Sequence, residues 1–284
     1  MTAVPLENGG PGRPLRIVSF GEVLFDIFDD GARLGGAPLN LAVHLHRLGA
    51  EPLLVSAVGQ DTLGDVAIQE IVREGLPVDH VARVPQPTGS VTVSLNEAKV
   101  PAYRFLRDCA YDYIPVPKLD LSELDLFCFG TLAQRGEASR STLRRLLSGI
   151  RCRVFCDVNL RQDFYSKEIL EHSLAAADVV KLNDDELPVI ASMFGIEPES
   201  GAVAKRFGLN TVILTLGPEG CEIWHDGEKF TSPAYPAEVV STVGAGDAFS
   251  AGFLFHCLSG HRIEIAAAEG NRLAAEVAAI PGAF

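Results

Sequence analysis

The sequence predicts an α/β fold in which helices cover both faces of a largely parallel sheet. Apolar segments of strand length alternate with segments of helical periodicity along the 284 residues. Parallel strands need long crossover connections, which are usually helices, so this alternation favours a parallel sheet between two helical layers. Several helical segments end at a glycine, which suits the left-handed residue that commonly terminates a helix. These are Gly49, Gly75, Gly149, Gly195, Gly208 and Gly260.

The predicted elements alternate along the whole chain. Strands are predicted at 15–20, 53–58, 126–129, 154–158, 179–182, 211–216 and 221–225. Helices are predicted at 40–48, 63–74, 137–147, 166–176, 184–194, 201–207, 244–258 and 263–279. The helix at 244–258 is almost wholly apolar, so we expect it to be buried. Ligands of such sheets bind at the carboxyl ends of the strands, so residues that directly follow strands are the site candidates.

Two segments interrupt the alternation of strands and helices. Residues 25–34 and 90–106 alternate apolar with polar residues around turns, which predicts antiparallel strands outside the main sheet. We expect them to form a small β lid over a binding cleft, at about 25–35 and 88–107, within a single domain over 15–284. Residues 1–14, which include several Gly and Pro, are expected to be a flexible N-terminus.

Composition excludes several classes of partner. The chain is 47% hydrophobic and 21% charged, with a net charge of −13. Nucleic-acid binding needs clustered Lys and Arg, and no basic run is present. No stretch approaches the roughly 20 apolar residues of a membrane span, and the N-terminus does not resemble a signal peptide. The six scattered cysteines form no CxxC pair and indicate buried thiols in a reducing compartment, so we expect a cytoplasmic protein.

The most informative motif lies at the start of the apolar helix, where Gly244, Ala245 and Gly246 precede Asp247. The first N–H groups of a helix have no intrahelical partner, and the helix dipole adds partial positive charge there. This arrangement suits a phosphate. Asp247 would repel that phosphate, which fits a base that deprotonates an attacking hydroxyl. The alternative is an ordinary first-turn acid beside turn glycines.

Polar residues near the N-terminus suit a ligand with several hydroxyl groups. Asp26 follows the first strand, and Gly35, Gly36 and Asn40 open the next helix. Asp26 and Asn40 offer an acceptor and an amide, while Gly36 allows close approach to the backbone. The alternative is that Asn40 is an N-cap and the glycines form a turn.

Arg161 follows another predicted strand and could bind a phosphate or a sugar hydroxyl. The alternative is a surface ion pair with Asp157 or Asp163. Asn183 and Glu186 also follow a strand, at a helix start, and could hold Mg²⁺ through water beside nucleotide phosphates. The alternative for Asn183 is an N-cap.

Thr215, Gly217 and Gly220 follow the strand at 211–216. The two glycines could form a loop against a nucleotide. A plain turn between two strands explains the same residues equally well.

In this order the motifs resemble the ribokinase-like (PfkB) family of sugar kinases, over almost the whole chain. The segment from Gly35 to Asn40 is similar to the family's N-terminal signature, and the run Thr242-Val243-Gly244-Ala245-Gly246-Asp247 to its specific C-terminal one. Asn183-x-x-Glu186 resembles the magnesium and phosphate motif, and Thr215-x-Gly217-x-x-Gly220 the nucleotide loop. The form Gly-Gly-Ala-Pro-x-Asn is most similar to fructokinases.

The resemblance implies a three-layer α/β/α sandwich with a small lid. It also implies ATP and Mg²⁺ as cofactors, Asp247 as the catalytic base, and an anion hole from Gly244, Ala245 and Gly246. Asp26, Gly36 and Asn40 would hold the sugar, and Asn271 would lie near the adenosine.

The chain departs from the family at Ser241, where relatives usually have an Asp that helps to hold potassium. The resemblance therefore does not carry potassium activation over to this chain. The segment between Asp26 and Gly35 is short, which predicts a small lid and leaves a homodimer open.

These expectations describe transfer of the ATP γ-phosphoryl group to a primary hydroxyl of a sugar. A ketohexose such as fructose is the first expected acceptor. The sequence leaves 2-keto-3-deoxygluconate, ribose or a nucleoside open as acceptors. A non-catalytic sugar or nucleotide sensor on the same fold is the alternative from another class.

Overall fold

A nine-stranded sheet forms the centre of the molecule in the computed structural model, which describes residues 12–95 and 101–284. The strand order is β13-β12-β11-β10-β9-β8-β1-β4-β5, and neighbours are parallel except at the β11–β12–β13 edge. The strands are β1 (Arg16–Phe20), β4 (Glu51–Gly59), β5 (Val81–Val84), β8 (Leu126–Gly130), β9 (Arg153–Asp157), β10 (Val179–Asn183), β11 (Thr211–Thr215), β12 (Cys221–His225) and β13 (Glu228–Ser232).

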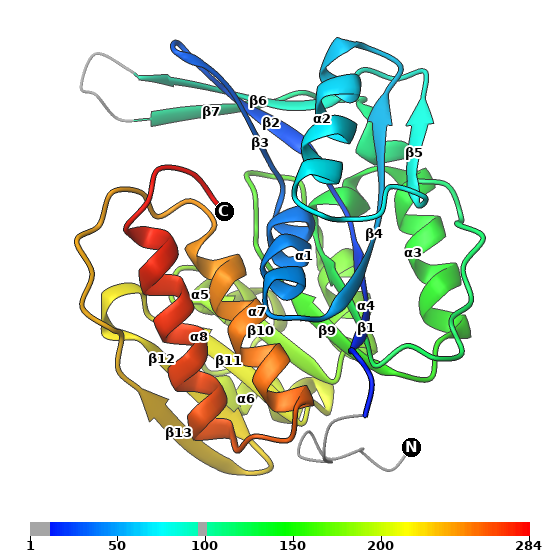
Figure 1. The fold of residues 1–284 in the computed structure, drawn as a ribbon. Coiled ribbons are helices and arrows are strands. Elements are labelled where there is room, and N and C mark those ends of the chain that lie inside the picture. Colours follow the sequence, from blue (N-terminus) through cyan, green and yellow to red (C-terminus); the bar gives the residue numbers. More distant parts are fainter. Residues whose placement is uncertain (1–11, 96–100) are drawn as a thin grey trace.

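Helices lie on both faces of this sheet, which confirms the predicted three-layer α/β/α architecture (Figure 1). On one face are α1 (Ala37–Arg47), α2 (Thr62–Arg73), α7 (Ala245–Leu258) and α8 (Ile263–Ala278). On the other are α3 (Glu137–Gly149), α4 (Lys167–Ala176), α5 (Glu186–Phe194) and α6 (Ser200–Phe207). Short 3₁₀ turns occur at Ala110–Tyr113, Leu132–Arg135 and Gly217–Glu219.

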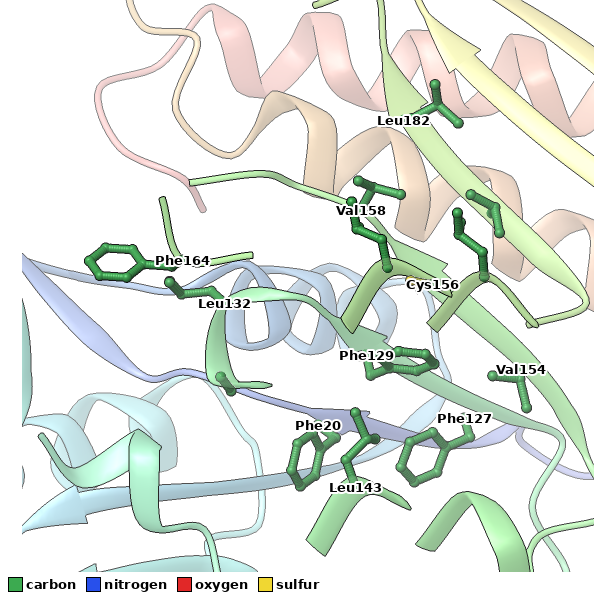
Figure 2. Close-up of a cluster of buried hydrophobic side chains, with 14 of the residues drawn as sticks. Phe20, Phe127, Phe129, Leu132, Leu143, Val154, Cys156, Val158, Phe164 and Leu182 are labelled. Atoms are coloured by element: carbon green, nitrogen blue, oxygen red, sulfur yellow. The ribbon is translucent and has the colours of Figure 1, made fainter. Parts of the chain in front are cut away.

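Side chains alternate between the two faces along each strand, so each helical layer has its own apolar core. In β8, for example, Leu126 and Cys128 face α1, α7 and α8, whereas Phe127 and Phe129 face the opposite layer. Figure 2 shows the second of these cores, where Phe20, Phe127 and Leu143 lie together. This packing fixes the strand register and hence the positions of the residues that follow each strand.

The second sheet has the order β3-β2-β6-β7 and corresponds to the two predicted lid segments. Its strands are β2 (Leu24–Phe28), β3 (Gly31–Gly35), β6 (Gly89–Leu95) and β7 (Pro101–Phe105). Both hairpins are antiparallel, as predicted, but β2 pairs with β6 in parallel. The parallel pairing follows because Leu24 and Gly89, the first residues of the two strands, lie side by side. Figure 1 shows this lid projecting beyond the main sheet.

Helix α7 is buried, as its apolar sequence predicted, and packs against α1 and α8. Glycines allow a close crossing of α7 and α8. A Cβ at Gly252 would lie 3.0 Å from the Glu269 carbonyl oxygen, and one at Gly270 would lie 2.9 Å from the Phe249 carbonyl oxygen. Across residues 12–95 and 101–284, no helix is long and apolar enough to cross a membrane.

The structure differs from the predicted elements at several boundaries. Helix α1 begins three residues earlier than predicted, because Pro38 fits the first turn of a helix, where no N–H bond is needed. The short strand β5 and the edge strand β13 were not predicted, since neither has a clear apolar pattern. Of the predicted flexible N-terminus, residues 1–11 lie outside the described residues, and Arg13 pairs with Asp125 at 2.9 Å.

Candidate active site

The carboxyl ends of the central strands bring the predicted motifs to one edge of the sheet. Strand register places Gly130 beside Asp157, and Asn183 beside Thr215. Helix α7 begins at the same edge, with Asp247 in its first turn. A small cavity of about 20 Å³ beside Asp247 is lined also by Asp157, Asn159 and Gly130. Residues far apart in the sequence therefore meet where a parallel sheet binds its ligands.

Asp247 is held by Asn40 from the opposite end of the chain. The Nδ2 atom of Asn40 donates to Oδ2 of Asp247 at 2.7 Å. Burial, followed by the nearby Asp157 carboxylate, raises the pKa of Asp247 to about 7, although Asn40, Lys181 and Arg161 act to lower it. A carboxyl with this pKa can accept a proton from a hydroxyl near neutral pH.

The start of α7 presents free backbone N–H groups next to that carboxyl. Gly244 is the N-cap, with a left-handed φ of 79°, and no side chain caps the helix. The N–H groups of Gly246 and Asp247 lie in the first turn, where helix geometry gives them no acceptor. The N–H of Ala245 instead points to the Thr242 carbonyl oxygen, at 3.3 Å. The predicted anion hole thus rests chiefly on the amides of residues 246 and 247.

A buried ion pair lies beneath this helix start. The Nζ atom of Lys181 is 3.0 Å from both carboxylate oxygens of Asp157, and both side chains are largely buried. Burial acts to lower the pKa of Lys181, but Asp157, Glu186 and Asp247 outweigh it and raise that pKa. A Cβ at Gly246 would lie 3.5 Å from Nζ. The ammonium group of Lys181, paired with Asp157, therefore lies close behind the predicted anion hole.

The residues predicted to hold the sugar gather at the root of the lid. Gly36 has a φ of 118°, and a Cβ there would lie 2.3 Å from the Glu22 carbonyl oxygen, so only glycine fits. The N-cap alternative for Asn40 is wrong, because α1 begins at Ala37 with Gly36 as its N-cap. Burial raises the pKa of Asp26, partly offset by Arg161 and Arg33.

Arg161 lies exposed in the loop after β9 and makes neither of the ion pairs considered as its alternative role. Asp157 pairs with Lys181, and Asp163 lies 3.3 Å from Arg107. Burial raises the pKa of the carboxyls of Glu22, Asp26 and Asp247, and the charge of Arg161 acts against that rise at each of them. The structure thus brings Arg161 to the same cleft as the predicted sugar ligands.

Asn183 and Glu186 form a reciprocal pair at the start of α5. Asn183 Oδ1 accepts the N–H of Glu186 at 2.9 Å, and Glu186 Oε2 accepts the N–H of Asn183 at 2.9 Å. The N-cap of α5 is Asp185, so Asn183 is not the N-cap of its alternative interpretation, although its side chain accepts the first N–H of the helix. Residues 184 and 185 form a turn, so α5 begins at Glu186 rather than at the predicted 184.

The nucleotide-loop residues form a turn between β11 and β12. Gly217 has a φ of 53° and nothing within 4 Å of a Cβ position, so its backbone is open to a ligand. A Cβ at Gly220 would lie 2.1 Å from the Ser232 carbonyl oxygen, so packing explains that glycine. Thr215 is half-buried beneath the turn. Asn271 is buried, and its Nδ2 lies 3.1 Å from the carbonyl oxygens of Ser232 and Pro233.

Two charged residues at the site received no role from the sequence. Lys181 is one, and as the single charged residue in the apolar strand β10 it carried a signal that could have found it. Glu22 is the other: it lies two residues after β1, is 4% exposed, and has an Oε2 atom without a hydrogen-bond partner. Burial raises the pKa of Glu22 to about 7.

Comparison with known proteins agrees with this geometry. The family model described as "pfkB family carbohydrate kinase" matches residues 16–283. A Pyrococcus horikoshii protein named only as a sugar kinase is 30% identical over 261 residues, covering 84% of this chain and 81% of its own. A fructokinase of Klebsiella pneumoniae is 30% identical over 259 residues, covering 84% and 83%. The solved structure of the Pyrococcus protein in complex with ATP matches with a TM-score of 0.82 and 28% identity, covering 94% of this chain and 93% of its own.

Proposed function

Since the chain belongs to the pfkB family of carbohydrate kinases, and is thus a phosphotransferase with an alcohol acceptor, we propose that it transfers the γ-phosphoryl group of ATP to a primary hydroxyl of a ketohexose such as fructose. One observation carries this proposal. The Asp247 carboxylate lies within the first turn of α7, beside free amides, and is oriented by Asn40 at 2.7 Å. A base and an anion site in contact are what hydroxyl attack on a phosphate needs.

In the proposed reaction Asp247 accepts the proton of the attacking sugar hydroxyl. This general-base step contributes typically 10²–10⁴-fold. The amides of Gly246 and Asp247, with Lys181 behind them, stabilise the negative charge on the transferred phosphoryl group. Asp26, Asn40 and Arg161 bind the sugar, with Gly35 and Gly36 allowing close approach beneath the lid. The lid would exclude water and so limit hydrolysis of ATP.

The part of the site that would bind the nucleotide suits an ATP molecule held largely by backbone groups. The open Gly217 turn, with Thr215, and the α7 helix start lie at the same sheet edge, and this supports a nucleotide extended between them. Asn271 would act indirectly, by holding the segment after β13.

The residues fit Mg²⁺ only as an ion held by phosphates and water. Both carboxylate oxygens of Glu186 already accept backbone N–H groups. Among the described residues no group of three His, Cys, Asp or Glu side chains could form a direct metal cage. Mg²⁺ usually keeps several waters, and Asn183 and Glu186 would contact those. The ion would neutralise charge on the phosphates.

A second acceptor is favoured by Arg161, which makes no ion pair within the described part of the chain. A guanidinium in a sugar site suits a carboxylate, so 2-keto-3-deoxygluconate is the alternative to fructose. Fructose would satisfy the same Arg161 through hydroxyl groups only.

A coupled ADP-release assay over fructose, 2-keto-3-deoxygluconate, ribose and nucleosides tests the proposal. We expect sugar-dependent ADP release that stops when EDTA removes divalent metal. Rates should be equal in potassium and in choline buffers, because Ser241 carries no charge and its Oγ accepts the N–H of Val243. Sugar binding without ADP release for every acceptor would instead indicate a sensor.

A further inference from the structure

Glu186 connects two loops that belong to different halves of the site. Besides the N–H of Asn183, its carboxylate accepts the N–H of Leu160, at 2.6 Å to Oε1. The residue is 4% exposed, so these charge-assisted bonds are shielded from water. One oxygen therefore holds the last residue of β10, on the nucleotide side, and the other holds the loop after β9. The neighbour of Leu160 in that loop is Arg161.

The loop held by Leu160 has a strained backbone on both sides of Arg161. Asn159 has a φ of 41° and Gln162 a φ of 48°, both in the left-handed region. Such residues are strained and persist where surrounding contacts over-determine them. Here the contacts are Thr131 Oγ1 to the Val158 carbonyl oxygen at 2.7 Å, and Gln162 Nε2 to the Tyr103 carbonyl oxygen at 2.6 Å.

Arg161 itself makes few contacts that could fix its place. Its one hydrogen bond within the described residues goes to the carbonyl oxygen of its neighbour Leu160, at 3.3 Å. The loop backbone must therefore set the position of the guanidinium relative to Asp26 and Asp247. Three hydrogen bonds fix this backbone, and the one from the Leu160 N–H to Glu186 is the only one of the three whose acceptor is a carboxylate.

We propose that Glu186 is a positioning residue for the sugar site, which acts by fixing the Leu160 amide and thereby Arg161. This inference rests on the proposed sugar-kinase function. It gives Glu186 a role that does not pass through the metal, and it links the nucleotide side of the site to the sugar side through one carboxylate.

The substitution Glu186→Gln tests the link at nearly constant volume. One amide oxygen can still accept an N–H, but the NH₂ group then faces the second N–H donor, so one loop loses its bond. We would measure the Kd for the sugar that the wild type phosphorylates, by calorimetry in EDTA without nucleotide. We expect a 10- to 100-fold weaker Kd, the size of effect that follows from misplacing a binding group by about 1 Å.

A double-mutant cycle with Arg161→Ala tests whether the effect of Glu186 on sugar binding passes through Arg161. If Glu186 acts through Arg161, the double variant should bind sugar no more weakly than Arg161→Ala alone. Ser200→Ala is the matched control. It removes a partly buried hydrogen bond from Ser200 in α6 to Glu222 in β12, away from this loop, and should leave the Kd unchanged.

Thr131→Val supplies a second variant should Glu186→Gln fail to fold. It releases the same loop at Val158 while leaving Glu186 intact, so sugar Kd should rise and the Mg²⁺ requirement stay the same. An unchanged sugar Kd in Glu186→Gln would overturn the inference. If Glu186→Gln does not fold, an unchanged sugar Kd in Thr131→Val would overturn it instead. A wild type that binds and phosphorylates no sugar would overturn the proposed function as well.

Discussion

Asp247 occupies a position that is electrostatically unfavourable and chemically useful. Burial and Asp157 disfavour its ionised form, while Asn40, Lys181 and Arg161 favour it, and the balance leaves a pKa of about 7. A base with this pKa is ionised in an appreciable fraction of molecules near neutral pH and still binds a proton strongly. The side chains around Asp247 therefore set its basicity as well as its orientation.

Replacing Asp247 with Asn should abolish the base and keep the shape. We expect kcat to fall about 10²–10⁴-fold with little change in ATP affinity, since the α7 amides are untouched. Steady-state ADP release and nucleotide titration measure the two quantities. Asp79→Asn, an exposed acid outside the site, is the control. Wild-type kcat in Asp247→Asn would refute the assignment of the base.

The acid limb of the pH–rate profile should report Asp247. Because only the ionised carboxyl accepts a proton, kcat/KM should fall tenfold per pH unit below about pH 7 and level off above it. Lys181→Met removes a charge that lowers the pKa of Asp247, so the limb should move to higher pH. A profile recorded from pH 5 to 9 for both proteins tests this. An acid limb at the same pH in both would show that Lys181 does not influence the pKa of Asp247.

At the scale of elements, the start of α7 depends on a glycine that packs tightly. Gly244 has a left-handed φ of 79°, and a Cβ there would lie 2.5 Å from that of Ala283. Gly208, at the end of α6, has a similar φ of 71° but nothing within 4 Å. Alanine substitutions at the two glycines therefore separate the free-energy cost of a left-handed backbone from the cost of a steric contact.

Gly244→Ala and Gly208→Ala should therefore differ in activity. Both should lose about 1–2 kcal/mol of stability from the left-handed backbone. Only Gly244→Ala must also shift the helix start that we propose binds phosphate, so we expect its kcat to fall at least tenfold. Urea unfolding and ADP release measure the pair. Equal activity of the two variants would show that the anion hole tolerates the shift.

The sequence predicted elements best where packing and pattern agree. The buried helix at 244–258 and the six parallel strands of the interior were found, since each has a clear apolar period. The parallel pairing of β2 with β6 was not, because it depends on where two hairpins leave the main sheet. The start of α5 was predicted two residues too early, because residues 184 and 185 form a turn that the apolar period does not distinguish from a helix.

The site was predicted in the same uneven way. Asn40 and Asp247 were singled out by their spacing from nearby glycines, and the structure brings the two side chains together at 2.7 Å. Neither Lys181 nor Glu22 was assigned. Lys181 could have been found as the lone charge in an apolar strand, whereas no local pattern records the burial of Glu22. The link from Glu186 to Leu160 joins residues 26 positions apart and needs the register of β9 and β10 to be known.

At the scale of the whole molecule, the acidic site should reduce stability at higher pH. The pKa of Asp247 is about 7 in the folded chain against 3.8 as the unperturbed value. Between these pH values the carboxyl is already ionised in the unfolded chain but still protonated in the folded one. The contribution of Asp247 to folding stability is therefore fully present only below about pH 3.8 and is lost as the pH rises toward 7. Glu22 acts in the same direction.

Asp247→Asn should consequently be more stable than the wild type, by a margin that depends on pH. We expect the difference in the free energy of unfolding to be larger at pH 8 than at pH 5.5. Urea midpoints at the two pH values measure it, with Asp79→Asn expected to show no such trend. A constant difference would mean that the native pKa of Asp247 is close to that of the unfolded chain.

The hydrogen bond between Asn40 and Asp247 spans 207 positions of the chain. Contacts of such separation form late, after intervening loops have been closed. The first and last thirds of the chain must both be in place before the base is oriented. During refolding, recovery of activity should therefore lag behind recovery of helical signal, and a nascent chain still lacking α7 on the ribosome would be catalytically silent. Activity in this protein thus reports that folding is complete.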